Sequence, residues 1–189
     1  MAKQVQGCRN CDLWRNATQA VFGEGRTSAH ILLIGEQPGN DEDRQGRPFV
    51  GPAGKIMDRL LAEAGIDRSK VYVTNVVKHF KWEPRGKRRI HKKPSAREIA
   101  ACRPWLDAEI ARVKPKAIVC LDATAAQALL GRSFRVTQRG GEFIVSPLAP
   151  YVMATIHPSA ILRAPDEGSR HAQEQRFVRD LKLIARLKL

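Results

Sequence analysis

His91 ends the segment Lys87-Arg88-Arg89-Ile90-His91, inside a basic run from Lys78 to Lys93. A run of this kind is most often a solvated surface loop. Here proline and glycine residues on both sides give the backbone a defined path, and a neutral imidazole is a nucleophile. Either His91 is a reactive residue on a basic arm, or the segment is an ordinary cationic loop.

The four cysteines form a second candidate group. Cys8 and Cys11 are spaced C-x-x-C, and two thiolates at this spacing can bind one metal ion or one corner of a cluster. No strand is predicted before the pair, which disfavours thioredoxin-like redox chemistry. Cys102 and Cys120 are either buried core residues or the other two ligands of a four-thiolate site, which we favour. Zinc and a four-iron, four-sulfur (4Fe-4S) cluster both accept that ligand set.

Polar residues follow three predicted strands. Apolar runs at 30–34, 71–75 and 151–156 indicate buried parallel strands. Glu36 and His157 come just after two of them, and Asn75 ends the third. Ligands of open α/β sheets bind at the carboxyl edge of the strands, so we expect these side chains to share one site. The amide of Asn75 offers a donor and an acceptor, which suits an amide-like ring edge.

The remaining periodicity completes an α/β pattern. Another strand is predicted at 117–121, residues 133–145 indicate a hairpin or edge excursion, and helices are predicted at 56–64, 95–113, 124–130 and 170–187. Strands that alternate with helices predict a three-layer α/β/α sandwich with a central, mostly parallel four-stranded sheet. We expect residues 1–189 to form a single domain with a basic insertion at about 78–94.

Phe49 lies between proline and glycine residues, outside any periodic pattern. The following Gly54-Lys55 pair does not complete a phosphate-binding loop, because Ile56 replaces the required Ser or Thr and Phe49 replaces the first glycine. Phe49 is therefore either presented to a flat ligand or packed as a core residue under the loop.

Composition indicates the partner. The 189 residues carry a formal net charge of +14, which favours a polyanion such as a nucleic acid. Aromatic residues make up only 6%, so a binder built on many stacking platforms is less favoured than one directed to a single site. No segment has the length and apolarity of a membrane span or signal peptide. We expect a cytoplasmic monomer of bacterial type that associates with the nucleoid when it acts.

Together these segments resemble a known family. The residues that carry the resemblance are Gly35-Glu36-Gln37-Pro38-Gly39, Arg47 to Gly54, Thr74-Asn75, His157-Pro158-Ser159 and the four cysteines. They are similar to the motifs of the iron–sulfur uracil-DNA glycosylases of the family-four type. Lys87 to His91, together with Gln37, resembles the UdgX branch of that family. The resemblance covers almost the whole chain and implies a uracil-DNA glycosylase-like fold.

The resemblance implies roles for individual residues. Phe49 would stack on uracil, Asn75 and Gln37 would bind its polar edge, and His157 would donate to a uracil oxygen. The DNA contacts would come from Lys87, Arg88, Arg89, Ser159 and Arg163, with Arg89 either binding a phosphate or holding the loop. A 4Fe-4S cluster would be held by Cys8, Cys11, Cys102 and Cys120, with zinc as the alternative. The substrate would be uracil-containing DNA, and free uracil would be released.

The UdgX branch implies one further step. His91 would attack the sugar, and Glu36 would orient His91 or accept its proton, so the protein would remain covalently linked to the abasic site. Two other functions stay open: an ordinary turnover glycosylase that activates water, and a zinc-containing DNA-binding module without catalysis.

Overall fold

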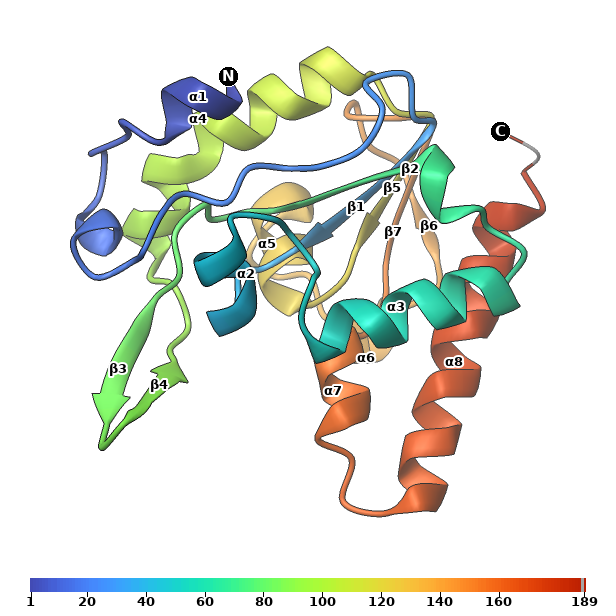
Figure 1. Cartoon of the computed structure of the whole chain (residues 1–189). Helices are drawn as coiled ribbons and strands as arrows, with labels where there is room; N and C mark the ends of the chain where they lie inside the picture. The colour runs from blue at the N-terminus through green and yellow to red at the C-terminus, as the bar shows by residue number, and fades with distance from the viewer. Residues whose placement is uncertain (188) are drawn as a thin grey trace.

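The computed structural model describes residues 1–187 and 189 and is built around a five-stranded sheet (Figure 1). The strand order is β2-β1-β5-β7-β6, in which neighbouring strands among β2, β1, β5 and β7 are parallel and β6 is antiparallel to β7. The bounds of these strands are Ile31–Gly35 (β1), Val71–Asn75 (β2), Ala117–Cys120 (β5), Phe143–Ile144 (β6) and Tyr151–Ala154 (β7).

Helices cover both faces of the sheet. Figure 1 shows α4 on one side of the sheet and α3 with α8 on the other. The helices are Ala2–Val5 (α1), Asn40–Gln45 (α2), Pro52–Glu63 (α3), Ala96–Val113 (α4), Ala123–Leu130 (α5), Val136–Arg139 (α6), Pro158–Leu162 (α7) and Glu167–Ala185 (α8). Within the described residues, no helix is both long and apolar enough to cross a membrane.

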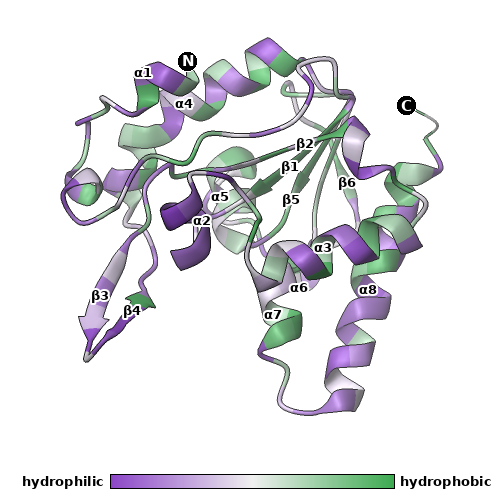
Figure 2. Cartoon of the chain, in the orientation of Figure 1, coloured by the Kyte–Doolittle hydropathy of each residue, from purple (hydrophilic) through white to green (hydrophobic). Residues whose placement is uncertain are grey.

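Burial on both faces explains the composition of the central strands. Every residue of β1, β2 and β5 is buried, and the strands appear apolar in Figure 2. Alternate side chains of β1 enter opposite cores: Leu32 and Ile34 pack with α4, whereas Ile31 and Leu33 pack with α3 and α8. A continuous apolar run is what such a doubly covered parallel strand requires.

The structure confirms the predicted fold class and adds one strand, β6, at the edge of the sheet. The three-layer α/β/α sandwich and the parallel order of four strands are as predicted. The sheet has five strands rather than four, because the segment predicted as an edge excursion contributes the two-residue strand β6 after the short helix α6. A capping box begins α4: the Ser95 hydroxyl accepts from the Glu98 backbone N–H, and the Glu98 carboxylate accepts from the Ser95 backbone N–H.

The basic insertion is a β-hairpin rather than an irregular loop. Strands β3 (Trp82–Arg85) and β4 (Arg88–His91) pair antiparallel, with Trp82 opposite His91. Gly86, at the first turn position, has a φ of 58°, which glycine adopts without strain. The hairpin projects from the body of the protein and is mostly hydrophilic (Figures 1 and 2). His91 therefore stands at the base of the hairpin, not at its tip.

Candidate active site

A pocket of about 580 Å³ lies at the carboxyl edge of the parallel strands. The ends of β1, β2, β5 and β7 and the hairpin strand β4 contribute to its walls. The structure brings together there the main residues singled out from the sequence, namely Glu36, Gln37, Phe49, Asn75, His91 and His157.

Three of the side chains that line this pocket converge on Gly35, the last residue of β1. A Cβ atom at Gly35 would lie 2.6 Å from Asn75 Oδ1, 2.9 Å from Phe49 Cζ and 3.4 Å from His157 Nε2. A side chain at Gly35 would therefore displace Asn75 and Phe49, whereas His157 would lie at an ordinary contact distance. The Phe49 ring lies roughly parallel to that of His157, with centroids 6.0 Å apart and planes inclined by 27°.

The backbone of Phe49 is held in an unusual conformation. Its φ is +57°, a region that non-glycine residues rarely occupy, and such strain persists only where the surroundings impose it. Gly54 allows this turn, because a Cβ there would lie 1.7 Å from the Phe49 carbonyl oxygen. Phe49 is 9% exposed and lines the pocket, so it is both packed against the core and presented to a ligand.

His157 is a neutral hydrogen-bond donor at neutral pH. Burial is the main cause that lowers its pKa to about 4, and the charge of Arg163, together with that of His91 when the His91 ring is protonated, adds to the effect. Its Nδ1 accepts from the Ser159 backbone N–H at 3.0 Å. The proton of the neutral ring is therefore on Nε2, the ring atom that lies nearest to Gly35.

Glu36 and His91 form the second chemical pair. Thr124 Oγ1 donates to Glu36 Oε2 at 2.5 Å, and the other oxygen, Oε1, lies 3.5 Å from His91 Nε2. The pKa of His91 is lowered, first by burial and then by Arg163, while the Glu36 charge acts in the opposite direction. His91 is therefore predominantly neutral at neutral pH, with half of its side chain exposed.

Gln37 fixes the position and tautomer of His91. The Gln37 carbonyl accepts from the Lys81 backbone N–H, and its amide nitrogen donates to the Lys92 carbonyl and lies 2.8 Å from His91 Nε2. Because that amide nitrogen is a donor, His91 Nε2 carries a lone pair and Nδ1 carries the proton. The Gln37 amide joins the segment after β1 to the hairpin, and Gln37 also lines the pocket, so that its binding to uracil stays a prediction.

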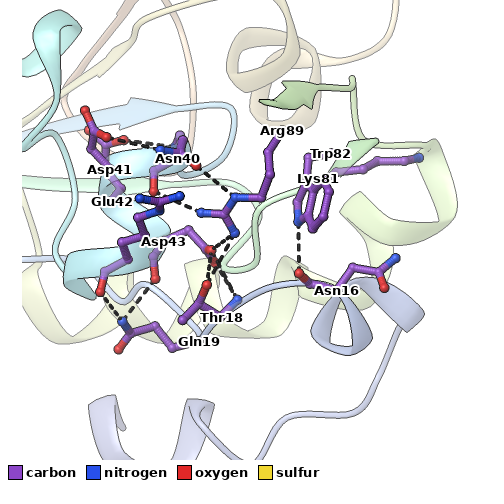
Figure 3. A network of polar contacts seen from close by, with 12 residues as sticks. Asn16, Thr18, Gln19, Asn40, Asp41, Glu42, Asp43, Lys81, Trp82 and Arg89 are labelled. Atoms are coloured by element: carbon purple, nitrogen blue, oxygen red, sulfur yellow. Dashed lines mark hydrogen bonds and ion pairs between the residues drawn. The ribbon is translucent and has the colours of Figure 1, made fainter. Parts of the chain in front are cut away.

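Arg89 fastens the hairpin to the body of the protein (Figure 3). Its guanidinium donates to Asn40 Oδ1 at 2.8 Å and to Asp43 Oδ2 at 2.6 Å. Asp43 is fully buried and also accepts from the Thr18 backbone and hydroxyl. The guanidinium also lies over Trp82, 5.3 Å from its ring centroid. Of the two roles left open for Arg89, this geometry favours holding the loop.

Arg89→Lys is expected to loosen the hairpin base without unfolding the protein. A lysine can reach Asp43 but cannot also bind Asn40 in the fixed fork of a guanidinium. The Lys92 amide, which bonds to the Lys81 carbonyl, should exchange its hydrogen about tenfold faster, as loss of one charged hydrogen bond implies. Arg88→Lys is the matched control, because Arg88 is exposed. Equal exchange in the two variants would contradict the anchoring role.

The other predicted DNA contacts are distributed around the pocket. Lys87 and Arg88 are exposed at the hairpin turn, and Arg163 is exposed at the end of α7 and lines the pocket. Ser159 is the second residue of α7 and bonds to His157. Lys78, the first cation of the basic run, is not on the surface: its side chain is fully buried and paired with Glu109.

The four-cysteine site is not formed as predicted. Cys8 and Cys11 both influence the ionisation of Cys102, whose pKa burial raises to about 11, so these three thiols lie near one another. Cys120 is enclosed in β5 between Ile34 and Ala154, and the charge that acts on its thiol is that of Asp122. No group of three or more Cys, His, Asp or Glu side chains within the described part of the chain is placed to hold a metal. Of the four predicted ligands, Cys120 is the one that lies apart from the other three thiols.

Two polar residues were missed by the sequence reasoning. His79 is buried, and it follows Lys78, whose backbone N–H donates to Cys102 Sγ at 3.2 Å. Burial lowers the pKa of His79, and Arg9 of the C-x-x-C segment adds to this. Asp122 follows β5 and lines the pocket beside Glu36. Asp122 directly follows the strand predicted at 117–121, as Glu36 follows a predicted strand, and this position could have identified it as a residue of the site.

The fold and the pocket define an α/β protein with a polar pocket at the carboxyl edge of its sheet. The sequence profile of the uracil DNA glycosylase superfamily matches residues 22–182, and the chain belongs to this superfamily.

It is similar to several type-4 uracil-DNA glycosylases. It shares 36% identity over 187 residues with that of Sulfurisphaera tokodaii (95% of this chain, 82% of the relative). Identity is 40% over 164 residues with that of Thermotoga maritima (86% and 82%). With the enzyme of Archaeoglobus fulgidus it is 32% over 195 residues (96% and 91%).

Proposed function

We propose that this protein excises uracil from DNA and becomes covalently linked to the resulting abasic site through His91. The observation that carries the covalent step is the position of His91, a neutral imidazole with its Nε2 lone pair 3.5 Å from the Glu36 carboxylate at the edge of the uracil pocket. The excision step is supported by membership of the superfamily and by the type-4 relatives.

The base is bound among Phe49, Asn75 and His157 of the pocket. The target nucleotide leaves the DNA stack to reach it. Phe49 stacks on the uracil ring, and the Asn75 amide pairs with its donor and acceptor edge. His157 Nε2–H donates to a uracil oxygen, where negative charge develops as the base departs. A neutral histidine suits this role, because its donor is present throughout the neutral pH range.

The covalent step exchanges one bond for another. The C1′–N1 bond breaks, its electron pair leaves with uracil, and the lone pair of His91 Nε2 forms a bond to C1′. The Glu36 carboxylate opposes the positive charge, first on the sugar and then on the alkylated imidazole. The Gln37 amide must release His91 Nε2 before this attack. Its other bonds, to the Lys81 and Lys92 backbone, still hold the base of the hairpin, which carries His91, beside the pocket.

Three of the cysteines are suited to hold the cluster. Cys8, Cys11 and Cys102 would supply thiolates, and buried His79, adjacent to the Cys102 contact, is the fourth donor that the chain offers there. In residue type these donors suit a 4Fe-4S cluster, with zinc as the alternative, although among the described residues they are not gathered around one point. Bound there, the group would tie the N-terminal segment to α4 and supply no step of uracil excision.

Formation of a covalent product distinguishes this function from that of an ordinary glycosylase, which turns over repeatedly. The protein is mixed with a single-stranded oligonucleotide that contains one uracil, and the products are separated on a denaturing gel after heating in detergent. We expect a heat-stable protein–DNA band whose amount never exceeds the amount of protein. The same oligonucleotide with thymine in place of uracil should give no band.

Two outcomes would contradict the proposal. Free abasic DNA without a shifted band would show an ordinary glycosylase that activates water. Retention of uracil in all of the DNA would show that the protein does not excise the base at all. Free uracil is measured in the same reaction, so these two outcomes are separated directly.

A further inference from the structure

The backbone carbonyl of Asn75 points away from the sheet. β2 is an edge strand, and the Val76 N–H, which shares a peptide group with the Asn75 carbonyl, donates to the Gly35 carbonyl of β1. The N–H and C=O of a planar peptide group point in opposite directions, so the Asn75 carbonyl faces the outer side of β2. Two residues earlier, the outward carbonyl of Val73 accepts from the Glu24 backbone N–H. Asn75 is buried, so its carbonyl needs a partner as well.

The ammonium group of Lys78 is that partner. Its three N–H groups are all used: they donate to the Asn75 carbonyl and the Thr74 hydroxyl, each at 2.7 Å, and to the Glu109 carboxylate at 2.5 Å. The side chains of Lys78 and Glu109 are both fully buried. Hydrogen bonds from a charged donor are stronger in such surroundings than in water, so the Asn75 carbonyl is firmly held.

Glu109 is itself fixed by several donors. Its Oε1 accepts from the Gly23 backbone N–H at 2.8 Å and from the Tyr72 hydroxyl at 3.1 Å, and its Oε2 accepts from the Thr74 hydroxyl at 2.8 Å. The carboxylate belongs to α4, whereas two of these donors belong to β2. The helix and the strand therefore place the ammonium of Lys78 together, despite its flexible stem.

We propose that Lys78 is a positioning residue for base recognition, which fixes the peptide group after Asn75 and thereby aims the Asn75 amide at the uracil edge. The inference rests on the proposed function, since it takes uracil as the bound base. The Asn75 side chain lines the pocket, whereas the fully buried Lys78 side chain acts through Asn75 and not on the base. A reacting group displaced by about 1 Å loses much of its rate, so the orientation of this peptide group matters for excision.

The test is single-turnover release of uracil from a single-stranded oligonucleotide, with the protein in excess and at several concentrations. These data give the maximal rate and the half-saturating concentration separately. Lys78→Met/Glu109→Gln removes the ammonium without leaving an unpaired charge, and the glutamine keeps an oxygen for the Gly23 backbone N–H. The maximal rate should fall about tenfold, the scale of one hydrogen bond, while the half-saturating concentration stays within about twofold because the DNA contacts are unchanged.

Thr74→Val tests the same network with the ion pair intact, and it serves if the double variant does not fold. Valine resembles threonine in shape but lacks the hydroxyl that accepts from Lys78 and donates to Glu109. The maximal rate should fall about threefold, because the ammonium loses one of its three acceptors. Thr74→Ser restores the hydroxyl and should return the rate to within about twofold of the wild type.

Ile184→Ala is the matched control for lost stability. Ile184 is a buried residue of α8 that lies beside Ile31, at the start of β1 and so at the opposite edge of the sheet. Truncation of a buried isoleucine destabilises the fold, and here it does so away from the active-site pocket. This variant should keep the wild-type maximal rate. A wild-type rate in Lys78→Met/Glu109→Gln would overturn the proposal, as would an equal fall in Ile184→Ala or a failure of Thr74→Ser to restore the rate.

Hydrogen exchange separates this inference from the proposed function, because it needs no DNA. The Val76 N–H should exchange about tenfold faster in the double variant, relative to the Ala117 N–H, which is bonded at the other end of the sheet. In Ile184→Ala this ratio should not rise. If the wild type released no uracil, the excision proposal would fail, while the exchange ratio would still decide whether Lys78 holds the Asn75 peptide group. An unchanged ratio in the double variant would exclude that role.

Discussion

His91→Ser is expected to lower the yield of covalent adduct by more than about a thousandfold, the scale on which removal of a nucleophile acts. Serine at this position has no imidazole lone pair at the pocket edge, and its shorter side chain leaves the space beside Glu36 open. Water can occupy that space and be activated by the Glu36 carboxylate. The variant should therefore still release uracil, and with excess substrate it should now turn over repeatedly.

Two measurements check this expectation on the same reaction: the shifted band on a denaturing gel and free uracil per molecule of protein. His171→Ser is the matched control, because His171 is an exposed histidine of α8 outside the pocket. It should form adduct as the wild type does. A persistent adduct in His91→Ser would identify another nucleophile, and loss of both adduct and uracil release would show that excision itself requires His91.

The position of the site was predictable because it depends on local patterns. Continuous apolar runs mark doubly covered strands, and the residues that follow them must meet at one edge of a parallel sheet. This reasoning placed Glu36, Asn75 and His157 around one pocket, as the structure does. Asp122 follows the fourth such strand and could have been included, but an aspartate before a helix also reads as an N-cap, a role that it does fill.

Long-range contacts were not predictable from the sequence. Arg89 bonds to Asp43 and Asn40, which precede it by 46 and 49 positions in the sequence. No periodic pattern in the hairpin distinguishes Arg89 from its exposed neighbour Arg88. Cys120 has the residue type of a metal ligand, yet it is a small residue inside a strand. His79 belongs to a basic run that predicts a solvent-exposed segment, yet its side chain is buried. In each case the deciding fact is which distant segment packs against the residue.

Lys78 illustrates the same limit, because it counts as a surface cation in the sequence and is a buried ion in the structure. Its Nζ donates to Glu109 Oε2 at 2.5 Å and to the Thr74 hydroxyl and the Asn75 carbonyl, each at 2.7 Å. Glu109 in turn accepts from the Gly23 backbone N–H at 2.8 Å. The pair therefore joins α4 to the end of β2, directly beneath the residue that is proposed to read uracil.

Lys78→Met is expected to lower the free energy of unfolding by about 3–5 kcal/mol, because it leaves the Glu109 carboxylate buried without its cation. Urea unfolding followed by circular dichroism at pH 7 measures this. The double variant Lys78→Met/Glu109→Gln should be more stable than the single one, since a neutral amide tolerates burial better than an unpaired charge. Lys92→Met breaks a half-exposed pair with Glu83 and should cost less than about 1 kcal/mol. If Lys78→Met cost no more than Lys92→Met, the buried pair would not be holding α4 to the end of β2.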